Sequence, residues 1–375
     1  MRGRRSLPRW AEIGLIPVVN VAIAFLFAAL VVLAIGANPL AAVRILIYGA
    51  FGYPDAIGYT LYYATNFIFT GLAVALAFHA GLFNIGGEGQ AYIGGLGVGL
   101  VMLAFDTTLA APLLIGLAIL AGAAFGAAWA AVPAYLQAYR GSHIVITTIM
   151  FNFIAAAVMV YLLVNVLIAP GSMTPETREF ATTAQLPFIH ELLALAGITM
   201  ASSPLNVSIF LALACCVFVW AFLWHTPWGF ELRAVGHNIQ VAAYAGIKLR
   251  RVTILAMCLS GALAGLVGVN EIAGVHHRII LNFPAGYGFG GIAVALMGRN
   301  HPVGVMLASL LFGALYQGGA ELAFEIPAIT KEMVVVIQGL VILFSGALAN
   351  MPRPWLARLF SALPRRVRMP VAGEA

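Results

Sequence analysis

Charged residues are scarce in this chain of 375 amino acids. Asp, Glu, Lys and Arg make up 9% of the sequence and apolar residues 62%, whereas an ordinary soluble domain has roughly 25% charged residues. The apolar stretches run for about twenty residues, which matches a hydrocarbon layer of roughly 30 Å at a helical rise of about 1.5 Å per residue. The period-2 alternation of a membrane β-barrel is missing. The composition therefore predicts an all-α, polytopic membrane helix bundle.

Cysteine and lysine are also rare. Cys215, Cys216 and Cys258 lie inside apolar segments without metal-ligand spacing, which predicts packing residues and neither a disulfide framework nor a zinc site. The two lysines are Lys248 and Lys331, and neither follows glycine. A phosphate-binding loop needs Gly-Lys-Ser/Thr. The chain therefore cannot bind ATP through a loop of this kind, and any ATP must be hydrolysed by a separate subunit.

Catalytic and cofactor motifs are equally few. The chain has no H-E-x-x-H and no G-x-S-x-G, and no nucleophile, base or metal cluster stands at workable spacing. The pair His276-His277 could ligate a metal, but a histidine pair at a helix end is more often interfacial. We therefore predict a chain that is not an enzyme and binds no metal or cofactor.

The basic residues are arranged as a topology signal. Ten candidate spans can be drawn: 13–35, 57–79, 83–104, 109–136, 143–168, 205–224, 252–274, 283–298, 302–322 and 329–350. Lys and Arg near span ends favour the cytoplasm, and here they lie at the N-terminus, at Arg140, within 233–251, at Arg299 and within 353–368. All of these fall on one side, so the net charge of +6 does not indicate a nucleic-acid partner.

This pattern gives the domain organisation. Residues 1–12 form a basic cytoplasmic N-terminus, 13–350 the transmembrane domain and 351–375 a basic cytoplasmic tail, so both termini are predicted to be cytoplasmic. The loop 170–204 is poor in positive charge and is expected to be periplasmic. The two halves, about 13–168 and 205–350, contain five spans each, and an odd number of spans gives the halves inverted topology.

Two glycine-rich stretches occupy matching places in the halves. Residues 81–90 read GLFNIGGEGQ and residues 284–291 read PAGYGFGG, and paired interruptions of this kind point to a translocation path. Alternatively, the glycines only let helices approach closely. Small-xxx-small packing of that kind is expected for Gly122/Gly126 and Gly261/Gly265.

Glu88 is the costliest residue of the apparent interior, since an ionised group near the bilayer centre is penalised by roughly 3 kcal/mol. It must face protein or water. Its predicted companions in a substrate path are amides and aromatic rings: Phe83, Asn84, Gln90, Asn152, Tyr287 and Phe289. Asn152 and the pair Asn270-Glu271 are weaker candidates, because amides also join helices in lipid. The alternative role for Glu88 is to cap a broken helix by accepting backbone N–H bonds.

The basic segment 226–251 is longer and more polar than a helix hairpin needs. It is predicted to form one short amphipathic helix ending at Gly246, with Arg233, His237, Asn238 and Tyr244 available to a partner. The alternative is a basic anchor that has no partner.

Three motifs resemble a known family. Residues 81–90 resemble the G-L-F-N-I-G-x-E-G-Q signature of permease subunits of bacterial ATP-binding-cassette importers, in the branch that serves nucleosides and simple sugars. The sequences RAVGHN at 233–238 and YAGI at 244–247 resemble the coupling loop of that branch, and 286–300 resembles its late glycine-rich span. The chain departs from the family at Ile239-Gln240, where Pro-Glu is common, and at Ile144, where an acidic residue is common.

The resemblance implies a multi-pass protein of the bacterial inner membrane that works with several partners. These are two cassette ATPases, a second permease (paralogue or self), a periplasmic or lipid-anchored solute-binding protein and membrane lipid. The loop 226–251 would seat in an ATPase groove through Arg233, Gly236, Asn238, Tyr244 and Gly246.

The leading hypothesis is thus an importer permease for a nucleoside or related solute. One alternative is an importer permease for a simple sugar. The other is an ion-coupled secondary transporter, which the inverted repeat and Glu88 permit equally well.

Overall fold

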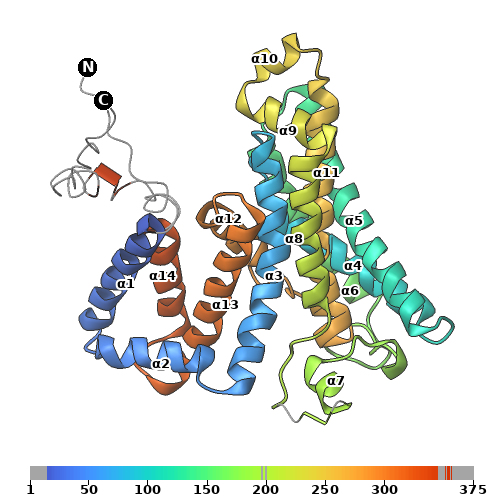
Figure 1. Ribbon diagram of the computed structural model, residues 1–375. Helices are drawn as coiled ribbons and strands as arrows, with labels where there is room; N and C mark the ends of the chain where they lie inside the picture. Colours follow the sequence, from blue (N-terminus) through green and yellow to red (C-terminus); the bar gives the residue numbers. More distant parts are fainter. Residues whose placement is uncertain are drawn as a thin grey trace, which may run out of the picture.

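The structure, a computed structural model, describes residues 15–195, 197–198, 201–344, 351, 353–354 and 356. Within these ranges the chain forms helices and loops, with no strand and one isolated β-bridge between Phe188 and Asn206. The prediction of an all-α fold is confirmed (Figure 1). The basic segments 1–12 and nearly all of 351–375 lie outside the described residues.

The helices follow in chain order. They are α1 Ile16–Ala34, α2 Pro39–Phe51, α3 Pro54–His79, α4 Gly87–Phe105, α5 Ala111–Arg140, α6 Ile144–Asn165, a 3-10 turn Thr182–Ala184, α7 Ile189–Leu195, α8 Ser208–His225, α9 Pro227–His237, α10 Ile239–Tyr244, α11 Leu249–Gly265, a π-helix Val269–His276 (η3), α12 Tyr287–Met297, α13 Pro302–Glu325 and α14 Lys331–Ile342.

Proline and short polar side chains mark several helix starts. Proline fixes φ near the helical value and lacks the N–H that the first turn leaves unpaired. At α2 the side chain of Asn38 accepts a hydrogen bond from the N–H of Leu40 at 2.9 Å, and Pro39 follows it. At α9 the hydroxyl of Thr226 accepts from the N–H of Gly229 at 3.0 Å. The Asn38 cap and Pro39 explain why a new helix begins at residue 39. The analysis of the sequence did not predict this helix.

Seven of the described helices are long and apolar enough to cross a membrane. They are α3, α4, α5, α6, α8, the continuous run Leu249–His276 and α13. The helices α1 and α2 pass the same test together but are bent by 119°, which gives at most eight spans in the described residues. The predicted total of about ten and the side on which the termini lie stay predictions.

The predicted span 283–298 is wrong in length. The helix there, α12, has 11 residues and covers only about 16 Å at a rise of 1.5 Å per residue. It is short because residues 281–286 form turns, with positive φ at Asn282, Ala285 and Gly286. The span predicted at 329–350 is described only in part, as α14.

The halves pack reciprocally. In the first half α3 packs along α12 and α13, and in the second half α11 packs along α4 and α5. Gly126 and Gly261 bring α5 and α11 into backbone contact, because a Cβ added at Gly126 would lie 2.2 Å from the carbonyl oxygen of Gly261. The predicted small-residue packing is confirmed at this interface. The division into two related halves and their inverted direction stay predictions.

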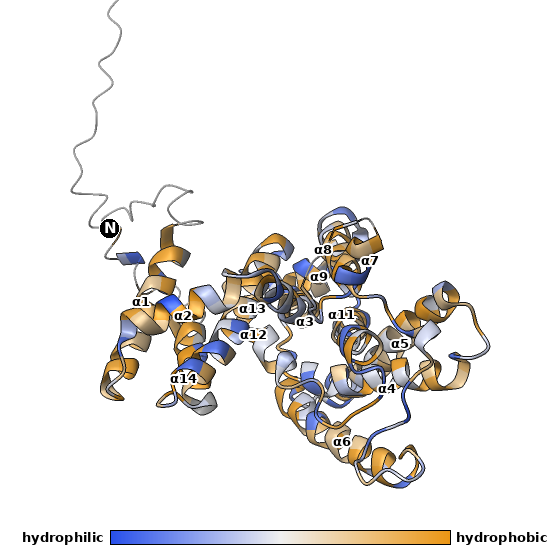
Figure 2. Ribbon diagram, turned by 90° about the horizontal axis from the view of Figure 1, so that it is seen from below, coloured by the Kyte–Doolittle hydropathy of each residue, from blue (hydrophilic) through white to orange (hydrophobic). Residues whose placement is uncertain are grey.

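Burial falls from the centre to the edge of the bundle. In the most apolar 18-residue window of α3, 83% of residues are buried, whereas in α6 the share is 22%. The outer helices α5 and α6 carry mainly hydrophobic residues (Figure 2), so they provide a surface suited to lipid. On the other flank, α1, α2 and α14 form a separate layer that packs on α13 (Figure 1).

Candidate functional site

The two glycine-rich stretches contact each other through Glu88. Its carboxylate oxygens Oε1 and Oε2 accept hydrogen bonds from the N–H groups of Gly286 and Gly288, each at 2.8 Å. Glu88 lies in the first turn of α4, and the two glycines lie at the start of α12. The carboxylate therefore joins the N-termini of two helices and caps α12, where unpaired N–H groups and the helix dipole favour negative charge.

Glycine is required where the stretches meet. A Cβ built on Gly288 would lie 2.1 Å from the backbone nitrogen of Glu88, a contact that no side chain rotation can relieve. Gly286 has a φ of +86°, which side chains other than glycine adopt at a cost. The glycines therefore let the two backbones approach closely here, which brings Glu88 within reach of α12; their role in a translocation path stays a prediction.

Asn152 fixes the first stretch from α6. Its side-chain nitrogen donates to the carbonyl oxygen of Ile85 at 2.9 Å, and its side-chain oxygen accepts from the N–H of Gly89 at 2.9 Å. The break before α4 leaves the carbonyl group of Ile85 and the N–H group of Gly89 without helical partners, and the side-chain amide of Asn152 bonds to both.

Asn84 and Gln90 form a buried network with two neighbouring helices. The Asn84 nitrogen donates to Gln90 Oε1 at 2.9 Å and to Ser260 Oγ on α11 at 2.8 Å. Ser260 in turn donates to the carbonyl oxygen of Ala73 on α3 at 2.6 Å. Asn84 is fully buried and Gln90 almost so, so in this structure both residues bond to protein groups.

The predicted aromatic residues do not share one surface. Tyr287 is 3% exposed and belongs to a ring cluster with Tyr63, Phe67 and Tyr316, with centroid distances from Tyr287 of 5.4 to 6.5 Å. Phe289 is 49% exposed. The structure therefore joins Tyr287 to the Glu88 junction and leaves Phe289 outside this cluster.

Phe83 lies apart from that cluster as well. It stacks on Phe78 near the end of α3, with ring centroids 5.1 Å apart.

A second buried carboxylate lies on the π-helix η3. Glu271 is 2% exposed, accepts hydrogen bonds from Tyr62 at 2.6 Å and Asn66 at 2.5 Å, and lies 3.3 Å from His276 Nε2. The sequence signal for this site was Asn270-Glu271 within an apolar run, whereas nothing in the sequence marked Tyr62. Single π-turns are frequent at functional sites.

His276 thus pairs with a carboxylate. In the described residues, no group of three or more His, Cys, Asp and Glu could hold a metal ion.

The segment 226–251 forms two helices, so the prediction of one helix is wrong. Asn238 ends α9 and caps α10, because its extended backbone breaks the helix and its side chain accepts from the N–H of Gln240 at 3.0 Å and of Val241 at 3.1 Å. Gly246, with a φ of +81°, follows the end of α10 close to the predicted position.

The α10 helix is an exposed tip at one end of the molecule (Figure 1). It presents Ile239, Val241 and Tyr244 to the exterior, and Tyr244 is 95% exposed. Apolar side chains gathered on a projecting polar segment are typical of a surface that docks a partner.

Backbone contact links this segment to the first glycine-rich stretch. A Cβ built on Gly236 would lie 2.2 Å from the carbonyl oxygen of His79 and 3.0 Å from the nitrogen of Gly81. His79 Nε2 lies 2.9 Å from the carbonyl oxygen of Asn300, just after α12. The end of α9 therefore touches the start of the stretch that carries Glu88, while Arg233 lies half-buried one turn earlier.

The opposite end of the bundle is fastened by charge. Arg178, in the loop 170–204, donates to both carboxylate oxygens of Asp106 at 2.7 and 3.0 Å, and this holds the pKa of Asp106 below its usual value. Arg278 forms salt bridges of 3.2 Å with Glu176 and Glu179 of the same loop. The loop is thus tied to α4 and to the segment after η3.

A family model and individual relatives both match this chain over most of its length. The family described as branched-chain amino acid transport system / permease component matches residues 56–346. The guanosine ABC transporter permease protein NupP of Bacillus subtilis is 36% identical over 331 residues, covering 88% of this chain and 92% of that protein.

Two further relatives carry names of different solutes. The glucose ABC transporter permease protein TsgB13 of Haloferax volcanii is 35% identical over 343 residues, 91% of this chain and 89% of the relative. The nucleoside ABC transporter permease protein NupB of Lactococcus lactis is 34% identical over 334 residues, 88% of this chain and 90% of the relative. No solved structure gives a significant match. The chain therefore belongs to the family of transport-system permease components, as a multi-pass membrane subunit of an ABC transporter.

Proposed function

We propose that this chain provides the membrane path of an importer for a nucleoside, and that a separate cytoplasmic ATPase drives it. The observation that carries this proposal is the Glu88 carboxylate, which joins the starts of α4 and α12. A path whose two breaks share one carboxylate can open only when the helix N-termini separate or turn together.

The route from motor to path follows the contacts in order. An ATPase would bind the exposed tip Ile239–Tyr244, and α9 would carry its displacement to Gly236. Gly236 abuts His79 and Gly81, so the displacement reaches the stretch 81–90 and, through Glu88, α12. In this role Arg233, Asn238, Tyr244 and Gly246 shape or present the docking segment.

The relatives and the aromatic rings support a nucleoside as solute. Proteins 36% and 34% identical are named for guanosine and for nucleosides, and the partly exposed rings of Tyr63 and Tyr316 are flat faces of the kind on which nucleobases stack. A simple sugar is the second candidate, favoured by the glucose permease at 35% identity. The family decides against the ion-coupled secondary transporter.

The remaining partners follow from the proposed role. A second permease, identical or paralogous, would complete the path. A periplasmic or lipid-anchored binding protein would deliver the solute to the face that carries the loop 170–204. We place the complex in a bacterial inner membrane, with α10 on the cytoplasmic side, no cofactor on this chain, no nucleic-acid partner and ATP hydrolysed by the partner subunit.

Uptake into proteoliposomes tests the proposal. The chain is reconstituted with its ATPase, second permease and binding protein, and uptake of labelled guanosine and labelled glucose is measured with and without ATP. We expect guanosine uptake that requires ATP and every subunit, and none with the purified chain alone. Uptake of glucose but not of guanosine would show that the solute is a sugar and not a nucleoside. Ion-driven uptake by the chain alone would overturn the proposal.

A further inference from the structure

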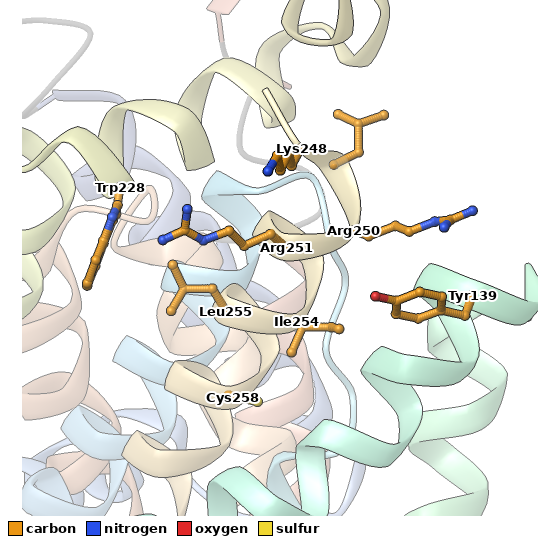
Figure 3. A pocket seen from close by; sticks show the side chains of 9 residues that line it. Tyr139, Trp228, Lys248, Arg250, Arg251, Ile254, Leu255 and Cys258 are labelled. Atoms are coloured by element: carbon orange, nitrogen blue, oxygen red, sulfur yellow. The ribbon is translucent and has the colours of Figure 1, made fainter. Parts of the chain in front are cut away.

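An open groove of about 830 Å³ lies where the two ends of the segment 226–251 join α8 and α11, away from the exposed tip Ile239–Tyr244. It is bounded by the last turn of α5, the start of α9 and the first turns of α11 (Figure 3). Its lining is Tyr139, Trp228, Lys248, Leu249, Arg250, Arg251, Ile254, Leu255 and Cys258. None of these residues takes part in the Glu88 junction or the exposed tip.

The upper part of the groove has positive charge without a matching acid. Lys248, Arg250 and Arg251 are exposed, and in the described residues none of them forms a salt bridge. They stand at the start of α11, which has no side-chain cap and no acidic residue in its first turn. The free N–H groups of a helix start add further positive charge. An anion bound at this position would be attracted by all three cations.

Aromatic rings flank the cations on both sides. The guanidinium carbon of Arg250 lies 4.9 Å from the ring centre of Tyr139, and that of Arg251 lies 5.8 Å from the ring centre of Trp228. Both rings are about half exposed. Tyr and Trp beside Arg and Lys at the end of an apolar span are typical of the level of lipid headgroups.

The lower part of the groove is apolar. Ile254, Leu255 and Cys258 lie one to two turns further along α11, inside the span Leu249–His276, and are partly exposed (Figure 3). The groove therefore runs from three cations to a hydrophobic strip. A free phosphate would use only the first part, whereas an amphiphile with an anionic head matches both.

We propose that this groove binds an anionic phospholipid, with its phosphate at the start of α11 among Lys248, Arg250 and Arg251 and an acyl chain along Ile254, Leu255 and Cys258. The site would hold lipid beside the segment that receives the ATPase, so the lipid composition would influence how α9 and α11 sit together. The inference needs only a membrane-spanning chain and does not depend on the solute or on the motor.

Quenching of Trp228 fluorescence tests the site directly. The full chain in detergent micelles is titrated with brominated phosphatidylglycerol or brominated phosphatidylcholine, and Trp228→Phe identifies the signal of this ring. We expect the anionic lipid to quench at lower concentration. Near an anionic surface each Arg contributes about 1 kcal/mol, so Arg250→Gln with Arg251→Gln should weaken the binding of the anionic lipid about 30-fold.

Two controls keep the result specific. Arg250→Lys with Arg251→Lys retains the charge and should retain most of the affinity. Arg44→Gln removes an exposed cation from a separate groove on α2 and should change nothing.

Three results would overturn the proposal. They are equal quenching by both lipids, unchanged affinity in the double Gln variant, and complete displacement of the lipid by inorganic phosphate, which would show a site for the free anion. Weaker ATPase binding by the double variant with lipid quenching intact would assign the groove to the protein partner instead.

Discussion

The two glycine-rich stretches meet, yet they are held in different ways. The stretch 81–90 carries its own polar groups, Asn84, Glu88 and Gln90, and receives a further amide from Asn152. The stretch 284–291 has no polar side chain beyond the buried Tyr287. Its backbone N–H groups at Gly286 and Gly288 bond to Glu88 of the other stretch.

The two halves therefore pack against each other in a similar way but contribute different polar groups to the junction. The first half supplies the carboxylate, and the second half supplies the N–H groups that need it. The start of α12 is capped by one carboxylate from another helix, whereas the break before α4 is held both by Asn84 of its own stretch and by Asn152 of α6. Loss of the single Glu88 carboxylate should therefore affect the start of α12 more than the start of α4.

Gly288→Ala should have the largest effect, because it separates the two stretches outright. The added Cβ would lie 2.1 Å from the backbone nitrogen of Glu88, and overpacking against backbone costs about 3 kcal/mol or more. Thermal unfolding in detergent should show a large loss of stability or of folded yield. Gly116→Ala on α5, where nothing lies within 4 Å, is the control and should be neutral or stabilising. A stable Gly288→Ala protein would mean that the stretches do not pack as described.

Glu88→Gln keeps the size of the side chain and removes one acceptor. One of the two N–H groups of α12 would then face an amide NH₂, which costs about 2 kcal/mol for a buried group. We expect lower thermal stability together with ATP-dependent uptake reduced about tenfold. The exposed Glu325→Gln at the end of α13 should behave as the unmodified protein. If Glu88→Gln left both stability and uptake unchanged, the shared carboxylate would have no role.

Asn152→Ala weakens only the first stretch. It removes the bonds to Ile85 and Gly89, and two net hydrogen bonds are worth about 1 to 2 kcal/mol. Asn165→Ala lies on the same helix, but the side chain of Asn165 is exposed and bonds to the carbonyl oxygen of Tyr161 of its own helix, so this variant should lose less stability. Chemical denaturation of the two variants gives the comparison, and equal losses would show that Asn152 does not fix the break.

Gly246→Arg should have a small effect on the stability of the fold and a large effect on coupling to the ATPase. Its φ of +81° makes any side chain unfavourable by about 1 kcal/mol, while nothing lies within 4 Å. Stability should fall slightly, and solute-stimulated ATPase activity of the complex should be lost. Gly171→Arg, with a φ of +81° in the loop 170–204 and equal space, should share the small stability loss and keep the stimulation. Equal stimulation in both variants would remove the loop 226–251 from the coupling route.

The smallest effect concerns the other end of α4. The Arg178 guanidinium lowers the pKa of Asp106, so this pair adds stability above the ordinary Asp pKa of about 3.9. That stability is lost as the pH falls through the lowered pKa of the folded protein. The difference in thermal stability between the unmodified chain and Arg178→Gln should hold between pH 7 and pH 5 and shrink towards pH 3. A constant difference across this range would exclude ionisation of Asp106 as the cause.

The sequence predicted the elements that depend on composition. Continuous apolar runs gave the helical membrane fold, the two glycine-rich stretches marked the site, and Glu88 drew attention because an isolated charge in lipid is costly. The capping alternative for Glu88 could be stated from the sequence, but the partner could not, because it lies about 200 positions away. The solute role of Glu88 stays a prediction.

The features that the sequence did not predict depend on tertiary contacts. The network of Glu271 with Tyr62 and Asn66 joins residues more than 200 positions apart. The short α12 results from turns that begin at Asn282; the sequence marked the interruption at 284–291 but did not show that it would shorten the span to 11 residues. By contrast, the division of 226–251 at Asn238 was within reach, since Asn is among the strongest helix caps.

The contact between Gly236 and the turn at Gly81 has a mechanical consequence. Where side chains separate two helices, a small shift of one is absorbed by rotamer changes in the other. Here peptide groups meet directly, so there is no compliant layer between them. In the proposed coupling route, a displacement of the tip would therefore pass from α9 to the turn at Gly81 through backbone contact, with no side-chain rearrangement at this interface.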